Sequence, residues 1–255
     1  MCLILFAWRT HPRYRLVLAA NRDEFHVRAS AAAAFWNDSP DLLGGRDLES
    51  MGTWLGMTRS GRMAAVTNVR DGRSEAPPNA PSRGRLASDF LCGGMPPATF
   101  ASQASAEGSA YRGFNLLIGD RDALWWTSNR GNGVRQLEPG VYGVANDLLD
   151  TPWPKVTAGK AALERALHSG PSLGILLALL ADTHVFADKE LPDTGVGLER
   201  ERILAPIRIV SPQYGTRCSS AVLIDADGRS QFAERSYDPD GSERETLYYA
   251  FEQAA

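Results

Sequence analysis

The sequence predicts an α+β fold in which two antiparallel β-sheets pack together and helices cover their outer faces. Three observations predict it. Short strand-like segments recur in hairpin pairs, and segments with a helical pattern are clustered between them. The first segment, CLILFAW at residues 2–8, is apolar at nearly every position. Such a strand is typical of the middle of a stack, where both of its faces are buried.

The first two apolar segments, CLILFAW and YRLVLAA, flank RTHPR, whose Pro12 has no N–H for a central ladder. They predict a hairpin. If its turn is centred just before Pro12, Cys2 lies opposite Asn21, and Arg22 and Asp23 follow directly. Partners in an antiparallel pair have Cα atoms about 4.5–5.5 Å apart. The polar NRDE stretch is therefore predicted to crowd the start of the chain.

The remaining elements follow from alternation, helical periodicity and turn residues. Further hairpins are predicted for residues 52–57 with 62–68, 114–120 with 123–129, and 218–225 with 229–237, and single strands for residues 141–146 and 246–252. Helices are predicted for residues 83–92, 153–169 and 172–182, the last capped by Ser172. Residues 70–82 form a Pro-rich loop. No repeat or linker is visible, so a single domain is expected over residues 1–255.

Composition narrows the classes of function. The 255 residues carry 27 Lys and Arg against 30 Asp and Glu, without a long basic run. Neither nucleic acid nor an anionic membrane is therefore expected as a partner on electrostatic grounds. The apolar stretch at residues 173–181 is half as long as the roughly 20 residues of a membrane span, and no secretory signal is seen. Three widely spaced cysteines favour reduced thiols and a cytoplasmic location.

Cys2 is a candidate nucleophile because removal of Met1 would make it the first residue. A thiol needs a base to attack at neutral pH, and a free α-amino group on the same residue titrates near pKa 7.7–8.0. Arg22 would stabilise a thiolate or bind a substrate carboxylate, and Asp23 would hold the α-ammonium group. Two plainer interpretations stay open at this point: Cys2 as a small buried hydrophobe, and Arg22 with Asp23 as a solvated pair at a strand end.

The chain resembles the NRDE family, also called the transport and Golgi organisation protein 2 family. The stretches that carry the resemblance run in order along nearly the whole chain: NRDEF, GGRDLESMGTWLGMTRSGRMAAVTN, PSRGRLASDFL, GFNLLIGD, SNRG, PGVYGVANDLLDTPWPKV, LPDTGV and YGTRCSSAVLIDADG. That family is in turn similar to N-terminal nucleophile hydrolases of the choloylglycine hydrolase and penicillin V acylase group. The resemblance implies a four-layer αββα sandwich and an N-terminal cysteine that cleaves linear amides.

The resemblance also implies roles for six residues. Cys2 would be the nucleophile and its free amine the base. Arg22 and Asp23 fall where the group keeps an Arg and an Asp beside the cysteine, although the group spaces them differently. Asn68 and Asn146 would contribute to an oxyanion hole, and Arg217, in YGTRCSS, is similar to a distal arginine that completes the cluster.

Other motifs are given structural roles. The four histidines lack metal-ligand spacing, so neither a metal nor another cofactor is expected. The segment GGRD is expected to form a turn with Arg46 and Asp47 as a salt pair. The adjacent Trp125 and Trp126 are expected to face opposite ways in a strand. Residues 70–82 and 182–195 are expected to cover the entrance of the site.

Two functions of different class follow. The first is an N-terminal cysteine nucleophile hydrolase acting on the carbon–nitrogen bond of a small, non-peptide amide. The alternative is a non-catalytic protein that keeps the hydrolase fold and binds or traffics a small ligand related to haem or lipid. A small molecule is the expected partner in both cases, and the sequence leaves the oligomeric state open.

Overall fold

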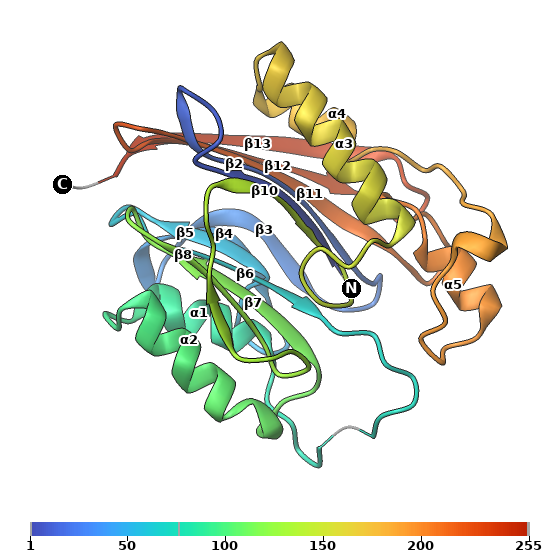
Figure 1. Ribbon diagram of the computed structural model, residues 1–255. Helices are drawn as coiled ribbons and strands as arrows, with labels where there is room; N and C mark the ends of the chain where they lie inside the picture. The colour runs from blue at the N-terminus through green and yellow to red at the C-terminus, as the bar shows by residue number, and fades with distance from the viewer. Residues whose placement is uncertain (1, 76, 254–255) are drawn as a thin grey trace.

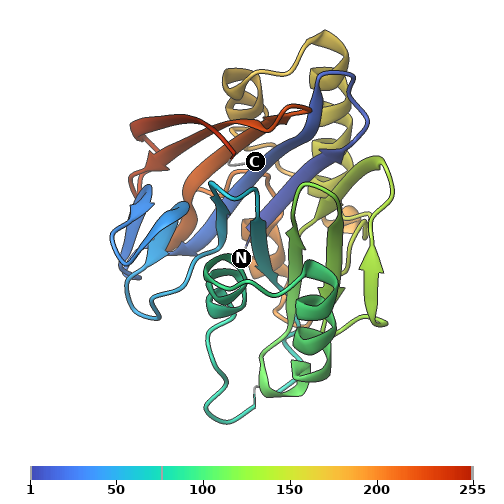
Figure 2. The same cartoon turned by 90° about the vertical axis from the view of Figure 1, so that its left-hand side faces the viewer.

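The computed structural model describes residues 2–75 and 77–253. Two antiparallel sheets stack face to face, helices α3 and α4 cover the outer face of one, and helices α1 and α2 cover the outer face of the other (Figure 1). The predicted four-layer αββα sandwich is confirmed. The same arrangement of sheets and helices is seen after a quarter turn (Figure 2).

The first sheet has six strands in the order β10-β1-β2-β11-β12-β13. Their bounds are β1 Cys2–Trp8, β2 Tyr14–Phe25, β10 Gly140–Val144, β11 Tyr214–Asp225, β12 Arg229–Tyr237 and β13 Glu243–Glu252. The second sheet has seven strands in sequence order, β3 to β9. Their bounds are β3 Ser30–Trp36, β4 Ser39–Asp47, β5 Leu55–Thr58, β6 Met63–Asn68, β7 Phe114–Gly119, β8 Leu124–Ser128 and β9 Val134–Gln136. All predicted hairpins are present.

The helices lie in the connections between strands. Their bounds are α1 Gly84–Cys92, α2 Pro97–Ala106, α3 Pro154–Ser169, α4 Leu173–Leu179 and α5 Leu198–Leu204, with short 3₁₀ turns at Gly108–Ala110 and Asp188–Glu190. The predicted cap of α4 is confirmed, because the Ser172 hydroxyl accepts a hydrogen bond from the Ile175 N–H. None of the helices in the described part of the chain has the length and apolar character that a membrane crossing requires.

Strand β1 shows why an uninterrupted apolar run belongs inside the stack. Ile4 and Phe6 are buried between the two sheets, in the core that also contains Leu117 of the second sheet. Leu3 and Leu5 face the opposite way and pack under helices α3 and α4. Successive side chains of a strand point to opposite faces, so burial of both faces demands apolar residues at every position. The prediction for this strand is confirmed.

The register of the first hairpin differs from the prediction by one residue. Cys2 pairs with Arg22, and Leu3 pairs with Asn21. The turn is therefore centred on Pro12 itself. One residue of register moves each partner to the other face of the sheet. The result is that Arg22, rather than Asn21, lies beside Cys2.

The segment GGRD is not a turn, and this prediction was wrong. It forms the end of strand β4, where a Cβ on Gly45 would lie 2.1 Å from the Trp54 ring. Its glycines serve close packing rather than reversal of the chain. Arg46 and Asp47 do not pair with each other: Arg46 binds Asp38 at 2.6 Å, and Asp47 binds Arg28 at 2.6 Å.

Strand β3 has a sequence, SAAAAFW, whose alanines favour helix over strand. Tertiary contacts decide its conformation. Its pairing with β4 is irregular between Ala31 and Ala34. There the Ala33 N–H donates to the buried Glu234 carboxylate at 2.6 Å, and the Ala33 carbonyl accepts from the Tyr249 hydroxyl at 2.7 Å. Both partners come from the first sheet, so no local pattern could indicate them.

Candidate functional site

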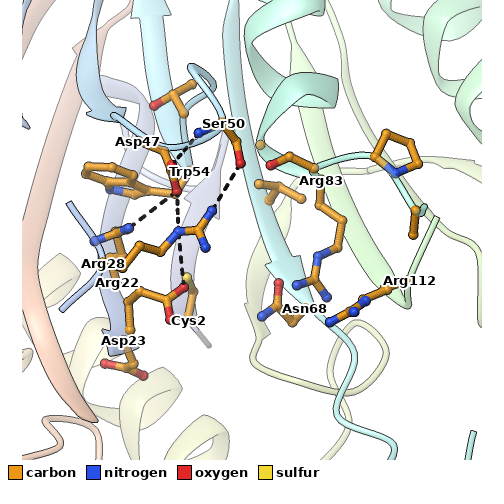
Figure 3. Close-up of a pocket in the computed structure, with 17 residues that line it drawn as sticks. Cys2, Arg22, Asp23, Arg28, Asp47, Ser50, Trp54, Asn68, Arg83 and Arg112 are labelled. Atoms are coloured by element: carbon orange, nitrogen blue, oxygen red, sulfur yellow. Dashed lines mark hydrogen bonds and ion pairs between the residues drawn. The ribbon is translucent and has the colours of Figure 1, made fainter. Parts of the chain in front are cut away.

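A cavity of about 280 Å³ opens where strand ends of the two sheets meet, and Cys2 lies on its wall (Figure 3). Its walls come from the ends of β1, β2, β4 and β6, from the start of α1 and from four connecting segments. The lining includes Cys2, Arg22, Asp23, Glu24, Arg28, Asp47, Asn68, Arg112, residues 80–84 and the stretch around Trp54. The volume is close to the lower end of the roughly 300–1,000 Å³ that is typical of small-molecule sites.

Cys2 and Arg22 are cross-strand neighbours on this wall. The Cys2 side chain is half-buried, whereas Arg22 is 5% exposed. Burial raises the pKa of the Cys2 thiol above its ordinary value, and the charge of Arg22 acts against that rise. The Arg22 guanidinium lies 4.2 Å from the centre of the Trp54 ring and 3.8 Å from Asp47. It is therefore held in place at the thiol by an aromatic face and a carboxylate.

Asp23 also lines the cavity and is 1% exposed. Its Oδ1 accepts a hydrogen bond from the Thr216 hydroxyl at 2.7 Å, and its backbone carbonyl accepts one from the Tyr214 hydroxyl at 2.8 Å. Burial raises the pKa of this carboxyl group, and the nearby Lys155 ammonium group opposes the rise. Both hydroxyls belong to β11, the strand that pairs with β2 on the side away from β1.

A group of ion pairs, which we call the wall ion pairs, borders the cavity on the β4 side. Asp47 lies 2.6 Å from Arg28 and 3.8 Å from Arg22, and Arg28 also lies 3.2 Å from Glu49. Burial alone would raise the pKa of Asp47, but hydrogen bonds from Arg28 and from the Ser50 N–H outweigh it, so the pKa is lowered. The carboxylate of Asp47 is thus kept ionised and tied to two cavity arginines.

The opposite wall carries Asn68, Arg83 and Arg112, whose side chains lie together in Figure 3. Asn68 ends strand β6, and Arg83 precedes helix α1. Nη1 of Arg83 donates to the Gly113 carbonyl at 3.1 Å. This wall therefore presents an amide and two guanidinium groups toward the thiol wall.

Four of the six predicted site residues, Cys2, Arg22, Asp23 and Asn68, line the cavity, and the other two lie behind it. Asn146 is fully buried, and its Nδ2 donates to the backbone carbonyl of Asn68 at 3.1 Å. Arg217 occupies the irregular step of β11 between Thr216 and Cys218. Its Nη1 donates to the carbonyls of Phe25 and Arg28 at 2.9 and 3.1 Å. Both residues therefore support elements that carry the cavity wall.

Asp23 belongs to a second group of charges, the buried charge cluster, which we define as Asp23, Lys155, Arg70 and Glu201. Arg70 pairs with Glu201 at 2.7 Å, with both side chains less than 5% exposed. The Lys155 ammonium donates to the Leu204 carbonyl at 2.8 Å. Burial lowers the pKa of Lys155 to about 8, although Asp23 opposes this.

Sequence reasoning missed Arg83, Arg112, Asp47 and Trp54 on the cavity walls and Lys155 behind them. Arg83 stands in PSRGR and Trp54 in GTW, two stretches that carry the family resemblance. That shared context is the only signal that pointed to them. Lys155 lies in the first turn of a helix, where a lysine normally reaches solvent, so its burial depends entirely on the elements packed around it.

The two loops expected over the entrance behave differently. The end of the first, residues 80–82, lines the cavity. The second packs against the start of the first: the Gly72 N–H donates to the Thr194 carbonyl at 2.8 Å, and Arg73 pairs with Asp193 at 2.7 Å. No residue of the second loop is part of the cavity lining in the described chain.

Over residues 2–75 and 77–253, no group of three or more His, Cys, Asp or Glu side chains is arranged to hold a metal ion. His26, the histidine nearest to NRDE in the sequence, has its Nε2 3.0 Å from the Ser211 carbonyl. It therefore holds the turn after β2 against the chain before β11.

The fold and the site together define the structural class of the protein. It is an αββα sandwich with a cysteine at a strand end, on the wall of a small cavity rich in arginine. Comparison with known proteins then gives the family. The model of Transport and Golgi organisation 2 matches residues 1–239. The Mus musculus Transport and Golgi organization 2 homolog is 36% identical, covering 98% of this chain and 99% of that protein. The Drosophila melanogaster protein is 29% identical, covering 96% of each. The chain belongs to the Transport and Golgi organisation 2 family.

Two solved structures are similar in outline. One is a Caenorhabditis elegans ortholog of N-acylethanolamine-hydrolyzing acid amidase, with a TM-score of 0.47 and 9% identity over 88% of this chain and 92% of that chain. The other is a mutant of the conjugated bile acid hydrolase from Clostridium perfringens, with a TM-score of 0.49 and 9% identity over 99% of this chain and 98% of that chain.

Proposed function

We propose that this protein is an N-terminal cysteine nucleophile hydrolase that cleaves the carbon–nitrogen bond of a small amide after Met1 has been removed. The observation that carries the proposal is the meeting of Cys2, Arg22, Asp23 and Asn68 at one small cavity. Met1 lies outside the described residues, so its removal is part of the proposal.

In the proposed reaction, the α-amine of Cys2 takes the thiol proton as the sulfur attacks the amide carbonyl carbon. The new S–C bond gives a tetrahedral oxyanion. This intermediate collapses, the C–N bond breaks, and the α-ammonium returns its proton to the leaving amine. Water then attacks the thioester with the amine again as base, which releases the acid and restores the thiol. Because burial raises the pKa of the thiol, the proton must be removed as the S–C bond forms.

The oxyanion would be met by the Asn68 side chain, which ends β6 on the wall opposite Cys2. Asn146 would position it, since the Asn146 amide holds the Asn68 backbone carbonyl. Arg22 would stabilise developing negative charge at sulfur, and Asp23 would hold the α-ammonium group. Arg217 would act through the turn whose carbonyls it binds.

The first test is the intact mass of the protein made with its native terminus. Loss of one methionine residue is the expected result, because every step above needs a free amine on Cys2. Retention of Met1 in protein from its natural setting would end the hydrolase proposal.

The second test measures the hydrolysis of a library of small N-acyl compounds by the protein. Cys2→Ala is expected to abolish turnover, and Asn68→Ala to lower kcat by about 10²–10³ with little change in KM. Cys92→Ala is the matched control, because Cys92 is a free, exposed cysteine away from the cavity. Turnover that survives Cys2→Ala would contradict the mechanism.

One observation favours the alternative, a protein that binds a small haem- or lipid-related ligand without turnover. Burial raises the pKa of the Cys2 thiol, which leaves it protonated and poorly nucleophilic unless an amine acts as base. A haem titration separates the two functions. A binding protein gives a stoichiometric spectral change that persists in Cys2→Ala, unless the thiolate ligates iron. An amidase gives instead an acyl-thioester at Cys2.

We also propose that residues 1–255 form a single domain, and that the protein is located in the cytoplasm. A core shared by both sheets supports the first point. Three free cysteines support the second, because such thiols persist in a reducing compartment.

A further inference from the structure

The wall opposite Cys2 holds two arginines close together. Arg83 is half-buried and directly precedes helix α1, and its Nη1 binds the carbonyl of Gly113 at 3.1 Å. Arg112 is the chain neighbour of that glycine and is exposed. Both guanidinium groups point to the same side of the cavity in Figure 3, next to Asn68. The Gly113 contact thus brings Arg83 to the turn that carries Arg112.

These two arginines differ from the other two in the cavity. Arg22 and Arg28 both lie within ion-pair distance of Asp47. Across residues 2–75 and 77–253, the ion pairs of the structure include no carboxylate partner for Arg83 or Arg112. The wall opposite Cys2 therefore carries two positive charges that no side chain neutralises by direct contact.

The electrostatic state of Arg83 agrees with this geometry. Burial lowers the pKa of its guanidinium, and the like charge of Arg112 lowers it further. Two cations that face each other at a partly desolvated wall are destabilised by their repulsion. An anion between them would relieve that repulsion and would accept charge-assisted hydrogen bonds from both forks.

Helix α1 adds a smaller contribution of the same sign. It has nine residues, its first residue Gly84 lines the cavity, and no side chain caps its amino terminus. The positive end of its dipole therefore lies on the same wall as Arg83. A cation would be repelled at this wall.

We propose that Arg83 and Arg112 form an anion subsite, which binds a carboxylate or phosphate group of the ligand while its amide lies at Cys2. This deepens the proposed function and rests on it for the placement of the amide. The ligand class is a small amide with one anionic end, because Cys2 and the two arginines line facing walls of one small cavity.

The test measures binding rather than turnover, in the full chain carrying Cys2→Ala. The probes are N-acetylglycine, its neutral analogue N-acetylglycinamide, and N-acetylaminomethylphosphonate. Titration calorimetry measures the affinity of each. We expect the better of the two anionic probes to bind at least about tenfold more tightly than the neutral one. A carboxylate source predicts that N-acetylglycine is the tighter anion, and a phosphate source predicts the phosphonate.

Arg112→Gln is expected to reduce the anionic preference to about twofold or less, and Arg83→Lys to weaken it while keeping the charge. Arg85→Gln is the matched control: Arg85 is an exposed arginine of α1 outside the cavity lining, so the preference should remain. Arg112 is exposed, so its variant is expected to fold, which a thermal melt confirms.

Equal affinity for the charged and neutral probes would overturn the subsite, as would a preference that survives Arg112→Gln or is lost equally in Arg85→Gln. Absence of measurable binding by all three probes would overturn it as well. The proposed hydrolase fails separately. If the anionic preference is present in Cys2→Ala but the natural-terminus protein cleaves no amide, the subsite stands and the hydrolase does not.

Discussion

The buried charge cluster and the wall ion pairs use the same residue types in different ways. In the buried charge cluster, Arg70 and Glu201 are 4% and 3% exposed and lie 2.7 Å apart. Among the wall ion pairs, Arg28 and Asp47 are 29% and 13% exposed and lie 2.6 Å apart. The distances are similar, but access to water is not. Solvent screens the wall ion pairs, whereas the buried charges depend on one another.

This difference separates support from recognition. A charge that water can reach is able to exchange a protein partner for a ligand at modest cost, as a cavity wall requires. A charge without water must keep its partner, so the buried charge cluster fixes the chain behind the site. Thr194 illustrates this, since its N–H and hydroxyl both donate to Glu201, at 3.0 and 2.6 Å, and thereby hold the segment before α5.

The largest effect is expected from breaking the buried pair. Glu201→Leu should lower the free energy of unfolding by about 3–5 kcal/mol, because the Arg70 charge then lacks its carboxylate. Urea denaturation measures this. The double variant Arg70→Met with Glu201→Leu should recover part of the loss, since it removes the stranded charge. A single-variant cost below about 1 kcal/mol would show that water reaches this cluster, and the comparison would fail.

A somewhat smaller effect is expected from Lys155 and depends on pH. Its pKa of about 8 in the folded protein lies below the ordinary 10.5, so the unfolded chain binds more protons between these values. The folded state therefore gains stability as pH rises from about 8 to 10.5, by on the order of 3 kcal/mol.

Lys155→Met removes this gain and keeps much of the apolar stem. The measurement is the difference in unfolding free energy between the two proteins as a function of pH, because subtraction cancels the groups they share. A difference that stays flat over the range from about 8 to 10.5 would mean that Lys155 is not desolvated.

The smallest effect is expected at the wall ion pairs. Asp47→Asn should cost about 1 kcal/mol in unfolding free energy at neutral pH, because Arg28 and the Ser50 N–H lose an ionised acceptor. The pKa of Asp47 is lowered in the folded state, so its contribution should disappear as pH falls below the ordinary 3.8. Asp193→Asn is the control: it breaks an exposed pair with Arg73 and should leave acid stability unchanged. Equal acid sensitivity of both variants would contradict the assignment.

The sequence by itself determined most of the fold. The run CLILFAW requires burial of both strand faces, so it specifies a position inside a layered structure without any knowledge of its neighbours. Turn residues and alternation specified the hairpins. The cysteine at the start of the first strand and the NRDE stretch at the end of the second indicated where the candidate site would lie. These are local properties, which a single stretch of chain carries in its own residues.

Only the tertiary structure decided what surrounds Cys2. A one-residue change of register placed Arg22 beside the thiol, and strand β3 formed from alanines because two side chains of the other sheet bind Ala33. Arg83 and Arg112 meet because a loop carbonyl at Gly113 holds one of them beside the other. Such contacts join residues that are distant in the chain, and their energy depends on desolvation, which appears only when the layers close.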